Sequence, residues 1–211
     1  MIRPAPLLLA AMLLLSGHEA LAAKLPPCKP KQAQLFIAPM GEPFRAGPND
    51  PYPSALWFAQ ADSNHDGKLT LAEMLADANR FFDRLDTDHD GQITPPENRV
   101  YEDKIAPEIR TQIGRVDDLL DAPKKVKHNK HAKPMPEGAG RWSSLPIPQP
   151  VISADADMNR AVTRAEFRAA AIDRFGRLDT AGQGYLTLAT MAKTPAETAA
   201  DAPCDATRSG R

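Results

Sequence analysis

The chain has 211 residues, enough for one domain or two small ones, and its 27 acidic and 26 basic residues almost cancel. This balance excludes the strong overall field with which a protein attracts nucleic acid or acidic substrates. The prolines are concentrated before residue 54 and between residues 123 and 150, so we expect both stretches to be extended rather than helical.

The N-terminus has the features of a secretory signal peptide. Arg3 gives a positive start, an apolar run covers Pro6–Leu15, and Ala20-Leu21-Ala22 places small residues at the spacing of a cleavage site. The apolar run is about half as long as a bilayer-spanning helix. We therefore expect removal of residues 1–22 and a periplasmic or secreted protein without an integral membrane segment. An uncleaved anchor is the alternative.

A twelve-residue acidic motif occurs twice in tandem. Loop 1 covers Asp62–Glu73, and loop 2 covers Asp86–Glu97, 24 residues further on. Both carry oxygen-bearing side chains at positions 1, 3 and 5, a glycine at position 6 and a glutamate at position 12, which is the pattern of a calcium loop. The predicted side-chain ligands are Asp62, Asn64, Asp66 and Glu73 in loop 1, and Asp86, Asp88, Asp90 and Glu97 in loop 2.

Calcium chemistry explains this spacing. Ca²⁺ takes about six to eight oxygen ligands, more than one short turn of side chains can present. The glycine at position 6 lets the chain turn through a conformation that other residues resist, and the backbone carbonyls of Lys68 and Gln92 would each add a ligand. The Thr-x-x-Glu sequence that ends each loop is also a helix capping box, so we expect each loop to start the next helix.

Two weaker copies of the motif follow. Loop 3 keeps a ligand set but has Arg160 at position 6, where a left-handed backbone costs a non-glycine residue about 1–2 kcal/mol. Metal binding by loop 3 is therefore left open. Loop 4, Asp179–Thr190, has lost the ligand at position 3 and the closing glutamate, so we predict a structural loop without metal. The candidate ligands of loop 3 are Asp155, Asp157, Asn159 and Glu166.

Helical periodicity places one shared helix between the loops of each pair. At about 22 Å, a helix of this length keeps loops 1 and 2 apart. Antiparallel packing of the two shared helices should pair loop 1 with loop 4, and loop 2 with loop 3. We expect Leu69 to meet Leu186 and Ile93 to meet Val162 in short two-stranded contacts. The predicted apolar faces are Leu71, Met74, Leu75, Ala78, Phe81, Phe82 and Leu85 in the first helix, and Phe167, Ala170, Ala171, Ile172, Phe175 and Leu178 in the second.

Other helices are expected at residues 52–61, from Pro95 to about Ile105, and near residues 106–120. The prolines within residues 144–152 predict an extended approach to loop 3 in place of an entering helix.

The loops and their flanking helices resemble EF-hand proteins over roughly residues 51–104 and 151–194. The short interval between neighbouring loops is similar to that of bacterial lanmodulins, which bind lanthanides and carry proline at loop position 2. Ser63, Thr87, Ala156 and Thr180 stand at that position here, so lanthanide selectivity is not supported. The resemblance implies Ca²⁺ as the bound ion.

The resemblance also implies an all-α, EF-hand-like fold. We expect four helix–loop–helix units, two intact and two degenerate, in a compact bundle with short β contacts between loops. The predicted organisation is a signal peptide (1–22), a Pro-rich segment (23–50), a first loop pair (51–104), a Lys-, His- and Pro-rich connection (105–150), a degenerate second pair (151–194) and a tail (195–211).

The leading functional interpretation is calcium binding, by a sensor or by a module that calcium holds folded. The alternatives are a dockerin-like calcium-dependent interaction module, with an unidentified envelope protein as partner, and a scavenger of lanthanides or other metals. The sequence contains no nucleophile elbow, phosphate loop or metal-hydrolase motif, so we expect no enzyme activity.

Four further features carry expectations. Cys28 and Cys204 should form a disulfide in an oxidising compartment, with two free thiols as the alternative. The basic run Lys124–Lys133 is interpreted as a solvated linker rather than a site for anionic lipid, polysaccharide or a transition metal. His65 and His89, at loop position 4, should face solvent, and Trp57 and Phe58 should belong to the core.

Overall fold

The structure is a computed structural model that describes residues 28, 32–110 and 136–204. Contacts divide the chain into residues 1–29 with 203–211 and residues 30–202, and the helices and strands lie in the second unit. The predicted signal peptide and the basic run at 124–133 lie outside the described residues. Among the residues that are described, no helix has the length and apolar character needed to cross a membrane.

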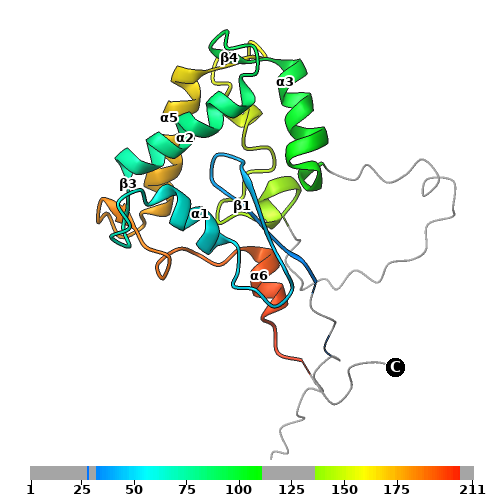
Figure 1. The fold of residues 1–211 in the computed structure, drawn as a ribbon, viewed down its shortest axis with the longest axis vertical. Helices are drawn as coiled ribbons and strands as arrows, with labels where there is room; N and C mark the ends of the chain where they lie inside the picture. The colour runs from blue at the N-terminus through cyan, green and yellow to red at the C-terminus, as the bar shows by residue number, and fades with distance from the viewer. Residues whose placement is uncertain (1–27, 29–31, 111–135, 205–211) are drawn as a thin grey trace, which may run out of the picture. The chain divides into compact units, whose positions relative to one another are not determined.

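Helices dominate the described part of the chain (Figure 1). A π-helix, Tyr101–Ile105, directly continues the third α-helix, so the helix expected from Pro95 to Ile105 is present in two forms. Of the helix expected near 106–120, a 3₁₀ turn at Pro107–Ile109 is described, and residues 111–135 are not. The five α-helices of the described residues are α1 (Ser54–Ala61), α2 (Leu71–Leu85), α3 (Pro95–Val100), α5 (Arg164–Leu178) and α6 (Pro195–Ala200).

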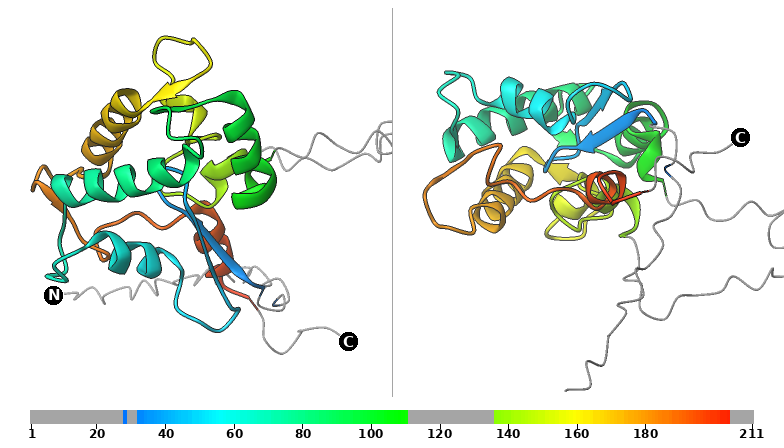
Figure 2. Two further views of the ribbon diagram at one scale, coloured as in Figure 1. Left: turned by 45° about the horizontal axis from the view of Figure 1, so that its top comes forward. Right: turned by 90° about the horizontal axis from the view of Figure 1, so that it is seen from below.

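Short strands join the loops in the predicted pairs. β3 (Leu69–Thr70) is antiparallel to β6 (Tyr185–Leu186), with Leu69 opposite Leu186. β4 (Gln92–Ile93) is antiparallel to β5 (Val162–Thr163), with Ile93 opposite Val162. Both expected contacts are confirmed, and α2 and α5 lie side by side in all views (Figures 1 and 2). Each end of this helix pair therefore carries one pair of loops.

The all-α prediction is not confirmed, because the sequence analysis missed a hairpin. β1 (Gln34–Ile37) pairs with β2 (Pro43–Ala46) inside the stretch that we expected to be merely extended. The turn closes through Gly41 N, which donates to Ala38 O at 2.8 Å, and Pro43 begins the second strand, a position that proline tolerates. The prolines, which led us to expect an extended segment, are thus compatible with the hairpin.

The hairpin turn is fixed to the helices by a buried carboxylate. Glu42 is 5 % exposed and forms ion pairs with Arg80 and with Arg84, the latter at 3.0 Å. Gln60 in α1 also donates to Glu42, at 3.0 Å. These contacts join the hairpin to α1 and α2 at once.

Two apolar clusters lie under the two loop pairs. The cluster near loops 1 and 4 contains Leu69, Leu186 and the predicted core residues Trp57 and Phe58. The other cluster, near loops 2 and 3, includes an edge-to-face contact between the rings of Phe82 and Phe167, whose centroids are 5.6 Å apart. The core positions of Trp57 and Phe58 are confirmed by exposures of 1 % and 7 %.

The buried face of α5 differs from the prediction at two positions. Ile172 is 51 % exposed, whereas Arg174 is 2 % exposed. The buried residues Phe167, Ala171, Arg174 and Phe175 follow helical spacing, and Ile172 falls outside that stripe. The polar Arg174 takes a core position that residue type alone would assign to an apolar side chain.

The four-unit description is not confirmed either. A 3₁₀ turn, Ile152–Ala154, leads into loop 3, so the extended approach predicted there is wrong in detail, although no α-helix enters the loop. Gln149 Oε1 stabilises this turn by accepting hydrogen bonds from Val151 N at 2.8 Å and Ile152 N at 3.0 Å. Loop 4 ends in hydrogen-bonded turns at Thr187–Thr190 rather than in a helix.

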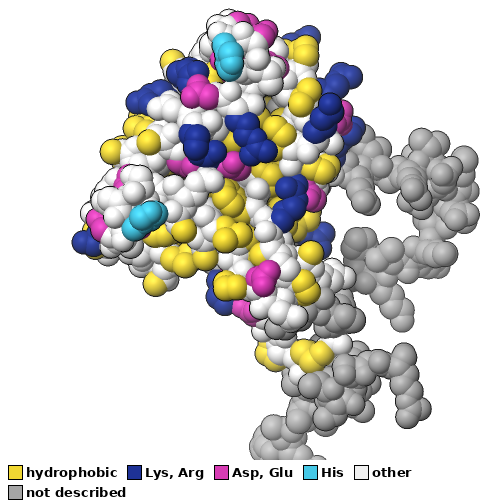
Figure 3. All heavy atoms as spheres, viewed as in Figure 1, with side chains coloured by type: hydrophobic (Ala, Val, Ile, Leu, Met, Phe, Trp, Pro, Cys, Tyr) yellow, Lys and Arg dark blue, Asp and Glu magenta, His cyan; other side chains and the backbone are white. Residues whose placement is uncertain are grey.

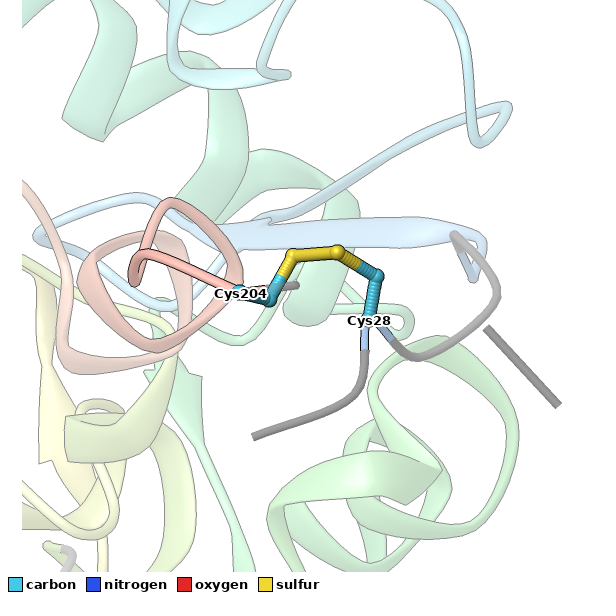
Figure 4. The surroundings of a disulfide bond; sticks show 2 residues. All are labelled: Cys28 and Cys204. Carbon is cyan, nitrogen blue, oxygen red and sulfur yellow. A yellow bond between two sulfur atoms is a disulfide. The ribbon is translucent and has the colours of Figure 1, made fainter. Parts of the chain in front are cut away.

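The predicted disulfide is confirmed. Cys28 and Cys204 are bonded to each other across a sequence separation of 176 residues (Figure 4). The bond therefore closes almost the whole described chain into one covalent loop.

Candidate metal centre

All four loops share one backbone conformation. Positions 4 and 6 have positive φ in every loop, including the two degenerate ones. Arg160 adopts φ +77°, close to the +79° and +86° of the glycines at the same position in loops 1 and 2. The residues concerned are His65, His89, Met158 and Gly182 at position 4, and Gly67, Gly91, Arg160 and Gly184 at position 6.

The first aspartate of each loop holds this backbone in place. In loop 2, Asp86 accepts hydrogen bonds from the N–H groups of Asp90 and Gly91, both at 3.1 Å. In loop 3, Asp155 accepts the equivalent bonds from Asn159 at 3.1 Å and Arg160 at 2.9 Å. Asp62 and Asp179 make the corresponding bonds in loops 1 and 4. The first aspartate of each loop thus organises the turn.

The closing glutamate reaches across each of loops 1 to 3. In loop 2, one oxygen of Glu97 accepts from Thr94 N at 2.8 Å, and the other accepts from Thr87 N at 2.6 Å and Thr87 Oγ1 at 3.0 Å. Glu73 and Glu166 make equivalent bonds to Thr70 and Thr163, which are the predicted capping boxes. The carboxylate therefore lies over the loop entrance.

The side chain at loop position 2 has a role that was not predicted from the sequence. Thr87 Oγ1 donates to Glu97, and Ser63 Oγ donates to Glu73 at 3.2 Å. Loop 3 has Ala156 at this position and uses its backbone N–H alone, at 3.0 Å. The serine and threonine at position 2 were the sequence features from which these hydrogen bonds could have been predicted.

These hydrogen bonds keep the closing carboxylates ionised. Hydrogen bonding by Thr70 lowers the pKa of Glu73, and hydrogen bonding by Thr163 lowers the pKa of Glu166. At Glu97, burial raises the pKa, but the bonds from Thr94 and Thr87 together outweigh it, so the pKa is lowered. All three groups are therefore charged at neutral pH, as a cation ligand must be.

Loops 2 and 3 bring their carboxylates together. Asp86, Asp88 and Glu97 have oxygens within 4.8 Å of one another, and Asp155, Asp157 and Glu166 do the same. Loop 1 has the amide of Asn64 at the third position, where its Oδ1 accepts from Asp66 N at 2.9 Å. In loop 4, Thr190 replaces the glutamate and hydrogen-bonds to Thr187, so Asp179 remains the one carboxylate of that loop's ligand positions.

The donor sets of loops 1 to 3 fit a hard cation. Their side-chain ligands offer oxygen alone, and this is the chemistry that Ca²⁺ selects. Within the described residues, Asp155, Asp157 and Glu166 of loop 3 form no ion pair with lysine or arginine, so their charge is not neutralised by side chains. The single carboxylate of loop 4 does not fit. Of the two predicted backbone ligands, Lys68 immediately precedes strand β3 and Gln92 is the first residue of strand β4.

The side chains at position 4 face away from the ligands, as predicted. His65 and His89 are exposed, and Figure 3 shows histidine side chains at the surface beside acidic ones. Trp57 lies behind loop 1, where its Nε1 donates to Asp77 Oδ2 at 3.0 Å. Its indole is therefore buried next to helix α2, which leaves the loop.

The comparisons with known proteins agree with this geometry for the first two loops. The family model for the EF hand matches residues 55–76 and residues 78–97, which contain loops 1 and 2 with the helices before them. A comparison with curated proteins finds no match. The match supports the predicted EF-hand relationship at these two adjacent loops.

Proposed function

We propose that this chain is an exported, non-enzymatic calcium-binding protein whose folded state is stabilised by Ca²⁺ at loops 1, 2 and 3. The observation that carries the proposal is the convergence of three carboxylates within 4.8 Å in loop 2 and again in loop 3. The EF-hand match at loops 1 and 2 supports calcium as the ion. Repulsion among these carboxylates destabilises the metal-free loops, and a divalent cation removes it.

A stabilising role fits the way the ligands are built into the core. Asp86 directly follows α2, and its exposure is 1 %, while the neighbouring Leu85 is buried in the cluster beneath loops 2 and 3. Glu97 lies in the first turn of α3 and is 7 % exposed. Ion binding therefore holds α3 against the end of the core helix α2. A sensor that exposes a new surface is the competing outcome.

Calorimetry tests the assignment of ion and loop. Titration of residues 23–211 with Ca²⁺ should give heat, with loop 2 as the tightest site because it offers four carboxylates against three in loop 1. Glu97→Gln should remove the tightest site, and Glu73→Gln should leave it in place. Absence of heat in the wild type would end the proposal.

Circular dichroism during the same titration separates the two roles. A rise in thermal midpoint with little helical gain supports a stabilised module, whereas a large helical gain with a change in tryptophan emission supports a switch. Competition of La³⁺ against Ca²⁺ tests the metal-scavenger alternative, and large La³⁺ selectivity would overturn the choice of ion. Capture of envelope proteins with and without EGTA tests the dockerin-like alternative. Helix α1 argues against this alternative, because it enters loop 1 and dockerins normally lack an entering helix.

A further inference from the structure

An arginine of loop 3, Arg164, lies next to Asp86, the first predicted ligand of loop 2. The strand pair β4–β5 places Arg164, at position 10 of loop 3, beside loop 2, and Arg164 N donates to Gly91 O at 3.3 Å. Its guanidinium lies 3.9 Å from Asp86 Oδ2 and 2.6 Å from Asp83 Oδ1. It also stacks over the ring of Phe82, at 4.3 Å from the centroid. Three contacts thus fix this cation at the edge of the loop 2 ligand set.

The contact is specific to one of the two loop pairs. In loop 4, which pairs with loop 1, position 10 is Leu188, an uncharged residue. Among the described residues, Asp62 of loop 1 forms no ion pair, whereas the equivalent Asp86 has Arg164 within 4 Å. Loop 2 therefore has the most acidic ligand set and also an adjacent positive charge.

We propose that Arg164 sets the metal affinity and the charge selectivity of loop 2 from its position in loop 3. This inference rests on the proposed function. A fixed positive charge beside a ligand repels an incoming cation, and the repulsion grows with the charge of the ion. Asp83 balances Arg164, so the affinity of loop 2 depends on the pair rather than on the arginine alone. Arg164 weakens the binding that four carboxylates would otherwise give, and the negative charge of Asp83 offsets this effect.

The variants Arg164→Gln and Asp83→Asn should act in opposite directions. Loss of the arginine should tighten Ca²⁺ binding at loop 2 about two- to fivefold in dilute salt, since the pair is partly exposed and screened. Loss of Asp83 should weaken it by a similar factor, because the guanidinium then acts on Asp86 unopposed. The double variant should return close to the wild type. A merely structural disturbance would weaken binding in both single variants.

Amide NMR gives the readout for each loop. Gly67 N and Gly91 N each donate to the first aspartate of their own loop, at 2.9 and 3.1 Å, so their shifts report loops 1 and 2 separately. The midpoint of the Ca²⁺ titration followed at Gly91 should shift in the Arg164 and Asp83 variants, and the midpoint followed at Gly67 should stay the same. Arg177→Gln, which removes the same charge at the other end of α5, is the matched control and should leave both unchanged.

A trivalent ion sharpens the test. The free-energy effect of one charge scales with ion charge, so a threefold gain for Ca²⁺ in Arg164→Gln should become about a fivefold gain for La³⁺. Equal gains for both ions, or a Gly91 titration identical to that of the wild type, would overturn the role of Arg164 while leaving calcium binding intact. If neither glycine responds to Ca²⁺ in the wild type, the proposed function itself fails.

Discussion

Arg174 is a buried cation that has no carboxylate partner among the described residues. It is 2 % exposed and donates to Pro39 O and Pro150 O, both at 2.8 Å, and to Ser153 Oγ at 2.9 Å. Burial, and after it the charge of Arg177, lowers the pKa of Arg174 to about 10, so the group stays protonated at neutral pH. One side chain therefore joins α5 to the hairpin turn and to the approach of loop 3.

Replacement of this arginine should destabilise the fold. Arg174→Met leaves the buried carbonyl of Pro39 without a donor and leaves Pro150 O with Ser153 Oγ as its donor. Because two charge-assisted hydrogen bonds to buried carbonyls are lost, we expect the free energy of unfolding to fall by about 2–4 kcal/mol. Arg174→Lys should lose nearly as much, because one ammonium cannot span both carbonyls. Urea unfolding in the presence of EGTA measures both changes without a contribution from bound metal.

The neighbouring Arg177 provides the control. Its side chain is 45 % exposed and forms a 3.6 Å pair with Asp173, so Arg177→Met should change the free energy of unfolding by no more than about 0.5 kcal/mol. An Arg174→Met variant as stable as the wild type would mean that the cost of burying the charge equals the gain from its hydrogen bonds.

At the scale of elements, the loop backbone tolerates loss of its usual residues. Loop 3 keeps the positive φ of position 6 with Arg160, and loop 4 keeps it although two ligands are gone. The first aspartate accepts the same pair of N–H bonds in all four loops. One retained carboxylate and the strand pairing are therefore sufficient to maintain the turn.

Arg160→Gly should stabilise loop 3. Glycine adopts the left-handed backbone without strain, which stabilises the fold by about 1–2 kcal/mol, and its greater flexibility in the unfolded chain costs about 0.5–1 kcal/mol. We therefore expect the free energy of unfolding to rise by about 0.5–1 kcal/mol. The N–H bond to Asp155 Oδ2 is retained, because it is a backbone bond. Urea unfolding with EGTA present measures the gain.

Arg160→Gln separates the backbone effect from the charge effect. It removes the charge but keeps a side chain at φ +77°, so stability in EGTA should stay near that of the wild type. Both variants should bind Ca²⁺ at loop 3 more tightly than the wild type, since each removes a cation from the loop. If glutamine stabilised the apo protein as much as glycine does, backbone strain would not be the cause.

The sequence predicts those elements whose signals are local or strictly spaced. The capping boxes and the opposition of Leu69 to Leu186 both follow from loop period and helix length. The hairpin was missed because its prolines argue for an extended segment, and its partners Arg80 and Arg84 are distant in sequence. Burial of Arg174 was missed for the same reason, since its carbonyl acceptors lie in other segments of the chain.

At the scale of the whole molecule, one strand connects the two apolar clusters. Phe36 lies in the cluster with Trp57, and the next residue, Ile37, lies in the cluster with Phe82. Successive residues of a strand point to opposite sides, so β1 contributes to both. We infer that the described residues 32–110 and 136–202 unfold as one cooperative unit rather than as two separate loop pairs, because neither cluster is complete without the hairpin.

The disulfide should add stability to this unit through the unfolded chain. A closed loop of 176 residues restricts the unfolded ensemble, and removal of the bond should lower the free energy of unfolding by about 2–5 kcal/mol. The double variant Cys28→Ser/Cys204→Ser should therefore melt roughly 5–15 °C below the wild type. Scanning calorimetry with and without a thiol reductant measures the difference, and the reductant should lower the midpoint of the wild type alone. Calcium affinity should be the same in both proteins, because neither cysteine is among the candidate ligands, which occur between residues 62 and 166 of the sequence. An unchanged midpoint in the double variant would show that the bond adds no stability, and that the loops, helices and hairpin alone stabilise the fold.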